Sequence, residues 1–422
     1  MSKRITRRSL LVGAGTTGVG AAAVVSGGYA LSHGRTVNSE PKSDTSTVLP
    51  FYGNHQPGII TSAQEHLHFA SFDLTTNDPT AVRGLLLIWS NAVATMMKGQ
   101  PLGEGTTPPH SPPADTGEAL GHQAERLTVT IGFGPTLFIK DGKDRYGLAA
   151  HRPEALIDIP PMAGDALEVE RSGGDLCVQA CSDNPLVAFH AVRNLARLGR
   201  GLAVMRWSQL GFNRTASTSK GQETPRNLMG FKDGTNNLKG EDSSLMDEHI
   251  WVNKNDQPAW MLGGSYLVAR RIRMHLESWD RDFLEDQQRV IGRHKVTGAP
   301  LGKAHEFDAV DLVAKDAKGE PLIHENAHIK LAGNESGIKI LRRGYSYTDG
   351  MDSQTGELDA GLFFLAYQRD PRKQFVPLQT RLAQNDLLNE YITHTSSAIF
   401  ACPGGIAQGG FIGETLFPRQ GV

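Results

Sequence analysis

Cysteine is scarce in this 422-residue sequence, with only three residues, Cys177, Cys181 and Cys402. So small and odd a number does not indicate a disulfide-bonded scaffold. Cys177 and Cys181 lie in a run that predicts a strand, where four residues span about 13 Å, too far for a disulfide. We therefore expect all three to be small core residues. The sequence has no Cys-x-x-Cys-His motif, which excludes a haem attached through that motif.

The chain also lacks an excess of charge of one sign. It has 43 basic and 45 acidic residues and a net charge of -2, so it lacks the excess of basic residues that is typical of nucleic-acid-binding proteins. Hydrophobic residues make up 39% and charged residues 21%, which is typical of a globular protein. The length is sufficient for two domains with full cores.

A strongly apolar run is missing as well, although the N-terminus comes closest. Four basic residues between positions 3 and 8 precede a Gly/Ala-rich run from Leu10 to Val25, which is weakly hydrophobic for a membrane span. Thr6–Leu11, with Arg7 and Arg8, resembles a twin-arginine export signal. We interpret residues 1–30 as that signal and 31–50 as a disordered spacer, which implies a periplasmic, extracellular or cell-envelope protein. Cleavage of the signal and retention as an anchor helix both stay open.

Four strand-then-helix units follow, two in each half of the chain. They predict an α+β fold with antiparallel sheets covered by helices on one face, duplicated over residues 51–222 and 223–422. The expected strands include His66 to Leu74, Asp175 to Cys181, Ser265 to Leu276, Gly361 to Tyr367, Leu127 to Phe133, Leu202 to Leu210, Ile338 to Leu341 and Ala398 to Ala401. Helices are expected after Asp78-Pro79 and Asn184-Pro185, from Trp279 to Gly292, and from Asp370-Pro371 through Leu382.

One motif points to zinc proteolysis. The run from His324 to His328 matches His-Glu-x-x-His, in which two histidines one helical turn apart bind zinc and the glutamate is the general base. Pro321 precedes the motif closely and Gly333 follows it, which leaves little room for a long helix. A zinc metalloprotease is therefore a remote alternative.

A second reading uses only His328, together with two segments elsewhere. The run Gly230–Asn237 (Gly-Phe-Lys-Asp-Gly-Thr-Asn-Asn) is a loop whose polar groups converge, and Arg342 lies fourteen residues beyond His328. Peroxide cleavage on a haem needs a group that moves a proton and a group that stabilises the developing negative charge. Asp233 and Arg342 suit these two roles, with His328 as axial ligand on the opposite face.

These segments resemble the dye-decolorizing (DyP-type) haem peroxidase family. Gly230–Thr235 resembles its signature loop, His328–Leu331 its proximal histidine segment and Leu341–Tyr347 its distal arginine segment. Further similar stretches extend from about residue 51 to 403, and the export signal favours the deferrochelatase/peroxidase subgroup. The resemblance implies two ferredoxin-like α+β domains of the dimeric α+β barrel type and one non-covalent haem b per chain.

The resemblance also implies roles for individual residues. Asp233 is expected to be the distal acid–base, Arg342 (rather than Arg343) the distal arginine and His328 the ligand of the iron. A proximal histidine usually needs a carboxylate on its other nitrogen, and Glu390 is our candidate. Residues expected to border the haem are Gly234, Thr235, Asn236 and Asn334. Trp260, Tyr345 and Tyr391 are each core aromatics or radical carriers.

We therefore expect a peroxidase that reduces hydrogen peroxide and oxidises aromatic or dye-like donors. The alternative within the same pocket is a deferrochelatase, which releases iron from haem and leaves the tetrapyrrole intact. A haem carrier without turnover would need neither Asp233 nor Arg342. Partners in an iron-uptake system and a homodimer are implied by the family alone.

Overall fold

The computed structural model describes residues 48–103, 109–333 and 337–417. The expected signal, nearly all of the expected spacer and Asn334 lie outside these residues. In the described part of the chain, no helix is long and apolar enough to cross a membrane.

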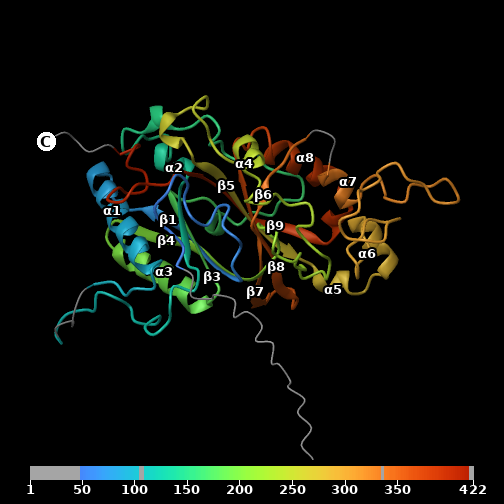
Figure 1. Cartoon of the computed structure of the whole chain (residues 1–422), viewed down its shortest axis with the longest axis horizontal. Coiled ribbons are helices and arrows are strands. Elements are labelled where there is room, and N and C mark those ends of the chain that lie inside the picture. The colour runs from blue at the N-terminus through green and yellow to red at the C-terminus, as the bar shows by residue number, and fades with distance from the viewer. Residues whose placement is uncertain (1–47, 104–108, 334–336, 418–422) are drawn as a thin grey trace, which may run out of the picture. The chain divides into compact units, whose positions relative to one another are not determined.

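Nine strands form one antiparallel sheet in the order β5-β9-β2-β3-β1-β4-β7-β8-β6, with a further pairing between β5 and β8. Because β8 returns to β5, the sheet closes on itself into a barrel, in which strands of both halves alternate with helices along the chain (Figure 1). The strands are β1 His66–Leu74, β2 Thr128–Phe133, β3 Leu176–Ser182, β4 Ala203–Arg214, β5 Ser265–Met274, β6 Leu341–Arg342, β7 Tyr345–Met351, β8 Leu358–Gln368 and β9 Ile392–Cys402.

Each half of the barrel has the strand order of a ferredoxin-like fold. The first half reads β2-β3-β1-β4, and the second half reads β7-β8-β5-β9, which is the same order for its own strands. The halves meet where Phe133 pairs with Ala401 and where β4 pairs with β7 at Phe212 and Arg214. The expected duplicated α+β fold is therefore confirmed. Where the boundary between two domains lies stays a prediction.

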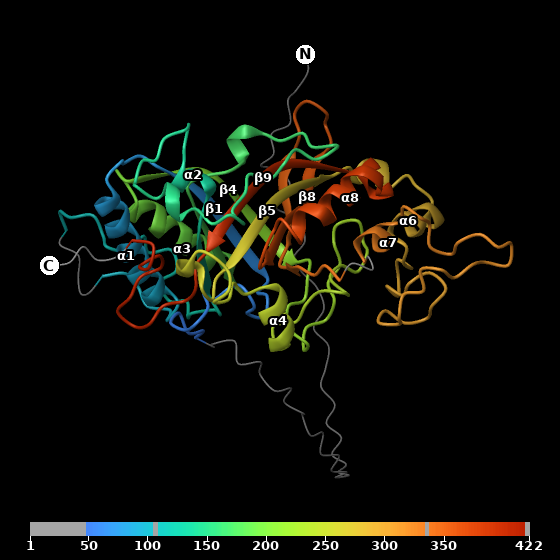
Figure 2. The same ribbon diagram turned by 90° about the horizontal axis from the view of Figure 1, so that it is seen from above.

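The helices lie outside the barrel, and Figure 2 shows α1 and α3 over the first half and α8 over the second. The α-helices are α1 Pro79–Met96, α2 Pro135–Phe138, α3 Pro185–Leu198, α4 Ser243–His249, α5 Leu276–Trp279, α6 Leu284–Ile291, α7 His328–Ala332 and α8 Phe375–Asn385. The short 3-10 turns are Ala149–His151, Val169–Arg171, Ala259–Met261 and η4 Leu387–Glu390.

Local sequence explains where the two longest helices begin. The Asp78 side chain accepts a hydrogen bond from the amide of Thr80 at 2.8 Å and precedes Pro79, the first residue of α1. Asn184 caps α3 in the same way, from the amide of Leu186 at 2.9 Å. A polar cap followed by proline satisfies one free amide and removes another, so both predicted starts are confirmed.

The second half departs from the prediction in three places. The predicted helix after Asp370-Pro371 begins only at Phe375, because Gln374 folds back to accept from the amide of Asp370 at 2.8 Å. The predicted helix ending at Gly292 is broken into α5 and α6. The predicted strand Ile338–Leu341 is reduced to the two residues of β6.

Three apolar clusters support the fold. The largest lies between the first-half strands and α1 and α3, and the second fills the barrel around Phe69, Phe363 and Phe400. A third, smaller cluster around Trp279 lies beneath the segment that contains Phe231. All three cysteines are buried and free, as predicted.

Candidate active site

The loop that carries Asp233 follows β4 and is fixed by its own backbone. The amide of Asp233 donates to the carbonyl of Pro225 at 2.9 Å. Gly234, the next residue, is buried and has a φ of +88°, and a Cβ at this position would lie 2.9 Å from the Cα of Ala216. Only glycine adopts this conformation without strain at so close a backbone approach. The loop therefore holds the Asp233 carboxylate on a defined turn.

Asn237, at the end of the same loop, holds the backbone of Arg342. Its Oδ1 accepts from the Arg342 amide at 2.8 Å, and its Nδ2 donates to the Arg342 carbonyl at 2.8 Å. The Arg342 guanidinium reaches back and donates to Oδ1 of Asp233 at 2.8 Å. The loop and β6 are thus joined by three hydrogen bonds, two to the backbone of Arg342 and one from its side chain. Our sequence reasoning assigned no role to Asn237, although a buried amide in such a loop indicates a backbone contact.

The side chain of Arg343 points away from Asp233, in the direction opposite to that of Arg342. Neighbouring residues on an extended segment point in opposite directions. Arg343 is fully buried and donates to the carbonyl of Thr61 and to the side chain of Gln64. Of the two arginines, it is Arg342 that contacts Asp233.

His328 is the first residue of α7, and a carboxylate fixes its ring through the Nδ1 atom. Its Nδ1 lies 2.6 Å from Oδ2 of Asp386, whose side chain is 3% exposed. The other oxygen of Asp386 accepts from the amide of Leu388 at 2.9 Å, which caps η4. Because Nδ1 is occupied, Nε2 is the ring atom left for a ligand.

Glu390 was the wrong choice for this partner. Its side chain is exposed at the end of η4, and the carboxylate that reaches His328 is Asp386, four residues earlier. Asp386 directly follows α8, so its position depends on where that helix ends. We expected the helix to end at Leu382, but it extends to Asn385. The fold-dependent end of α8 explains the error.

The electrostatics of His328 connect it to the other two residues. Burial alone would lower the pKa of the His328 ring, but the Asp386 carboxylate outweighs burial and holds the pKa above its ordinary value. The charge of Asp233 raises this pKa further, and the charge of Arg342 opposes it. The charges of Asp233 and Arg342 therefore lie within electrostatic range of the His328 ring.

The zinc protease site does not form. Helix α7 begins at His328 after Ala327 in an extended conformation, so His324 is not on the helix and cannot lie one turn away from His328. Glu325 is exposed and pairs with Lys330 at 2.8 Å. Among the described residues, no group of three or more His, Cys, Asp or Glu could hold a metal ion.

The other residues expected to border a haem differ in their surroundings. Gly234 is buried, and the Thr235 hydroxyl donates to Oε1 of Glu306 at 3.1 Å. Asn236 is exposed. Contact of these residues with a haem stays a prediction.

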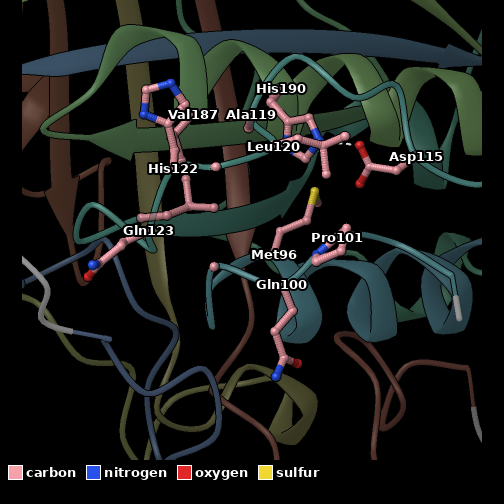
Figure 3. Close-up of a pocket in the computed structure, with 13 residues that line it drawn as sticks. Met96, Gln100, Pro101, Asp115, Ala119, Leu120, His122, Gln123, Val187 and His190 are labelled. Carbon is pink, nitrogen blue, oxygen red and sulfur yellow. Dashed lines mark hydrogen bonds and ion pairs between the residues drawn. The ribbon is translucent and has the colours of Figure 1, made fainter. Parts of the chain in front are cut away.

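A separate cavity lies in the first half of the fold and does not include the residues above. It is lined by side chains of α1, α3 and the segment around Leu120, among them His190 and Asp115, which form an ion pair (Figure 3). None of Asp233, His328 or Arg342 borders it.

Comparison with known proteins agrees with this geometry. The sequence profile for the N-terminal part of Dyp-type peroxidases matches residues 56–213, and the profile for their C-terminal part matches residues 224–407. This chain belongs to the Dyp-type peroxidase family. A curated relative named Deferrochelatase, from Escherichia coli strain 536, is 36% identical over 424 residues, which cover 97% of this chain and 96% of the relative.

Solved Dyp-type structures agree in fold. An oxyferrous complex of DtpA from Streptomyces lividans is 40% identical, with a TM-score of 0.80 over 88% of this chain and 98% of that chain. A DyP-type peroxidase from Streptomyces coelicolor is also 40% identical, with a TM-score of 0.81 over 89% of this chain and 98% of that chain. The chain is a haem peroxidase.

The residues present fit a haem. A histidine whose Nδ1 is held by a buried carboxylate, and whose side chain is still 32% exposed, can offer Nε2 to an iron. Asp233 and Arg342, paired at 2.8 Å, have the chemistry of an acid–base group and of a cation, and their charges reach the His328 ring. This donor set is suited to haem and to peroxide, and it is not suited to a closed zinc centre.

Proposed function

We propose that the chain binds one haem b without a covalent bond, holds its iron through Nε2 of His328, and uses Asp233 and Arg342 to reduce hydrogen peroxide. One observation carries the proposal: an Asp233–Arg342 pair at 2.8 Å accompanies a histidine whose Nδ1 is held by the buried Asp386 and whose side chain is still 32% exposed. The haem as a whole, iron together with its porphyrin, would supply the two electrons that cleave the O–O bond. The protein supplies orientation, proton transfer and charge.

Asp233 acts on the peroxide proton. As a carboxylate, it can accept the proton from the peroxide oxygen nearest to the iron and return it to the distal oxygen, which leaves as water. One carboxylate oxygen faces Arg342, and the other receives only a long hydrogen bond of 3.4 Å from Asn227. This second oxygen is therefore the better candidate to exchange the proton.

Arg342 acts on the charge. Its guanidinium is a cation held by Asp233, and Asn237 fixes its backbone, so it can stabilise negative charge that develops when the O–O bond breaks. Asp386 orients the His328 ring and makes Nε2 a more basic ligand.

The proposal is tested with Asp233→Asn and Arg342→Leu in the haem-loaded protein. Each is expected to lower the second-order rate of reaction with peroxide by about 10²- to 10⁴-fold, as for loss of a positioned proton-transfer or charge-stabilising group. Asp242→Asn is the control, because the Asp242 carboxylate pairs with Lys220 and not with Arg342. Wild-type rates in both site variants, measured by stopped flow at equal haem content, would refute the roles.

A second activity is favoured by one observation, the name Deferrochelatase carried by a relative that covers nearly the whole chain. We infer that the same pocket could release iron from haem while the porphyrin stays intact. The protein is incubated with haem, with and without peroxide, and free iron and protoporphyrin are measured beside the oxidation of an aromatic donor. Release of iron with intact protoporphyrin supports this activity, whereas donor oxidation without free iron leaves the peroxidase alone.

Bulky donors that cannot enter the pocket need a route for electrons. Tyr391 packs edge-on against Trp279 with ring centroids 4.9 Å apart, and Trp279 lies 5.9 Å from Phe231 of the signature loop. The Tyr391 hydroxyl donates to Asp282, which can accept its proton on oxidation. Trp260 and Tyr345 belong instead to the two large cores. Tyr391→Phe is expected to slow large dyes more than small phenols.

The location of the protein is inferred from its first thirty residues, and its partners are inferred from the family. We infer export by the twin-arginine route to the periplasm or cell envelope, where a homodimer and partners of an iron-uptake system are the expected associations. Replacing Arg7 and Arg8 by Lys in the full-length chain is expected to retain the protein in the cytoplasm. Export of that variant at the wild-type level would contradict the route.

A further inference from the structure

Glu306 lies between α6 and α7, far in sequence from the signature loop, yet its side chain binds that loop at two points. The ammonium group of Lys232 donates to Oε2 of Glu306, and the Thr235 hydroxyl donates to Oε1 at 3.1 Å. These two donors stand on either side of Asp233 and Gly234. The Glu306 side chain is 8% exposed, so these contacts are shielded from water and from salt.

The backbone around Glu306 is fixed as well. Arg293 donates to the Glu306 carbonyl at 3.0 Å and to the Gly298 carbonyl at 2.7 Å. Arg293 is itself 8% exposed. A carboxylate held in this way can determine where Lys232 and Thr235 lie, because its own position is set by the segment behind it.

The charge state agrees with this role. Burial by itself raises the pKa of the Glu306 carboxyl, but hydrogen bonds from Lys232, Thr224 and Thr235 outweigh burial, and the net pKa lies below the ordinary value. Glu306 is therefore an anion at neutral pH, and its two loop contacts are charge-assisted or directed at a charged acceptor.

Lys232 is the reason that such an anion matters. It is the residue directly before Asp233, and a lysine on a flexible stem would otherwise be free to pair with the Asp233 carboxylate. Asp233 has one guanidinium partner, Arg342 at 2.8 Å. A second cation on the same carboxylate would occupy the oxygen that is needed for proton exchange.

We propose that Glu306 is a positioning residue for the peroxide reaction: anchored to the loop by Thr235, it holds the Lys232 ammonium group away from Asp233, so that the Asp233 oxygen that does not bond Arg342 stays open to proton exchange. The proposal rests on the function proposed above for Asp233. It does not make Glu306 a catalytic residue, because Glu306 touches the loop and not the reacting atoms.

The test compares a single and a double variant of the haem-loaded enzyme. Glu306→Gln is expected to lower the second-order rate with peroxide by about ten- to a hundredfold, as for a small misplacement of a catalytic group. Haem content, Soret maximum and the KM for an aromatic donor are expected to stay at the wild-type values. Lys232→Met combined with Glu306→Gln is expected to restore the rate to within about threefold of wild type, because the competing cation is gone.

Glu320→Gln is the matched control, since Glu320 is an exposed carboxylate in the same segment. A merely structural role for Glu306 would leave the double variant as slow as the single variant or slower, and this result overturns the proposal. A wild-type rate in Glu306→Gln overturns it too.

Asp233→Asn in the same assay separates the two levels of the argument. If Asp233→Asn reacts with peroxide at the wild-type rate, the proposed function of Asp233 fails. If Asp233→Asn is slow while Glu306→Gln is not, the inference about Glu306 fails alone.

Discussion

Among the described residues, two histidines lie within hydrogen-bonding distance of an aspartate, one in each half of the fold. His190 of α3 lies 2.9 Å from Asp115, and His328 of α7 lies 2.6 Å from Asp386. The first pair uses Nε2 and its histidine side chain is 6% exposed, whereas the second uses Nδ1 and its histidine side chain is 32% exposed. The pairs therefore differ in which ring nitrogen has no aspartate partner, Nδ1 in His190 and Nε2 in His328, and in how exposed the histidine side chain is.

The aspartates differ less than the histidines. Asp115 also accepts from the amides of Leu102 at 2.8 Å and Gly117 at 2.7 Å, so it fastens a long connection onto α3 (Figure 3). Asp386 likewise caps a turn. A histidine–carboxylate pair thus stabilises the local fold in both places, and we propose that the more exposed ring of His328 serves in addition as a ligand site.

The largest expected effect separates the two histidines. His328→Ala is expected to abolish haem binding, because it removes the iron ligand. His190→Ala is expected to keep the Soret band and to lower the free energy of unfolding by about 1–3 kcal/mol, since it removes one of the three hydrogen bonds to the partly buried Asp115 carboxylate. Haem titration and urea unfolding check both. Loss of haem in His190→Ala alone would reverse the assignment.

Replacing each aspartate sharpens the contrast. Asp386→Asn is expected to reduce haem affinity or peroxide turnover by about 10- to 100-fold, as for other groups that orient a metal ligand. Asp115→Asn is expected to change neither at equal folded fraction. Equal effects of the two substitutions on turnover would mean that Asp386, like Asp115, only stabilises the fold.

Two glycines, one in the Asp233 loop and one outside it, allow a similar comparison with a smaller expected effect. Gly234 and Gly164 both have positive φ, +88° and +77°, but only at Gly234 would a Cβ meet backbone, at 2.9 Å. Gly164→Ala is expected to cost about 1 kcal/mol from conformation alone. Gly234→Ala is expected to cost more and also to slow the peroxide reaction, because the Asp233 turn must shift. Thermal unfolding and stopped flow on both variants measure the difference.

The smallest effect concerns pH and the first-half pair. Burial raises the pKa of Asp115, but hydrogen bonds from Leu102, His190 and Gly117 outweigh it, so the folded-state pKa lies below the ordinary value of 3.8. Its stabilisation is complete above that value and is lost as pH falls through the lower folded-state pKa. The stability gap between wild type and Asp115→Asn should therefore be constant from pH 7 to 5 and shrink on further acidification. A gap that instead grows in acid would contradict this sign.

Residue patterns predict much of this molecule. Asp78-Pro79 and Asn184-Pro185 determine two helix starts through local capping, and the loop at 230–237 is recognisable by its polar turn residues. The carboxylate behind His328 was not predictable, because Asp386 and Glu390 differ only in where α8 ends, which tertiary packing decides. Asn237 and Glu306 were missed for a similar reason, since their partners lie 105 and 71–74 residues away.

The central claim is that His328 and the Asp233–Arg342 pair face opposite sides of one haem. A crystal structure of the haem-loaded protein tests it most directly. We predict that Nε2 of His328 coordinates the iron, that Nδ1 keeps its bond to Asp386, and that Asp233 and Arg342 lie over the other face. Iron bound by a different residue, or Asp233 on the same face as His328, would contradict the account.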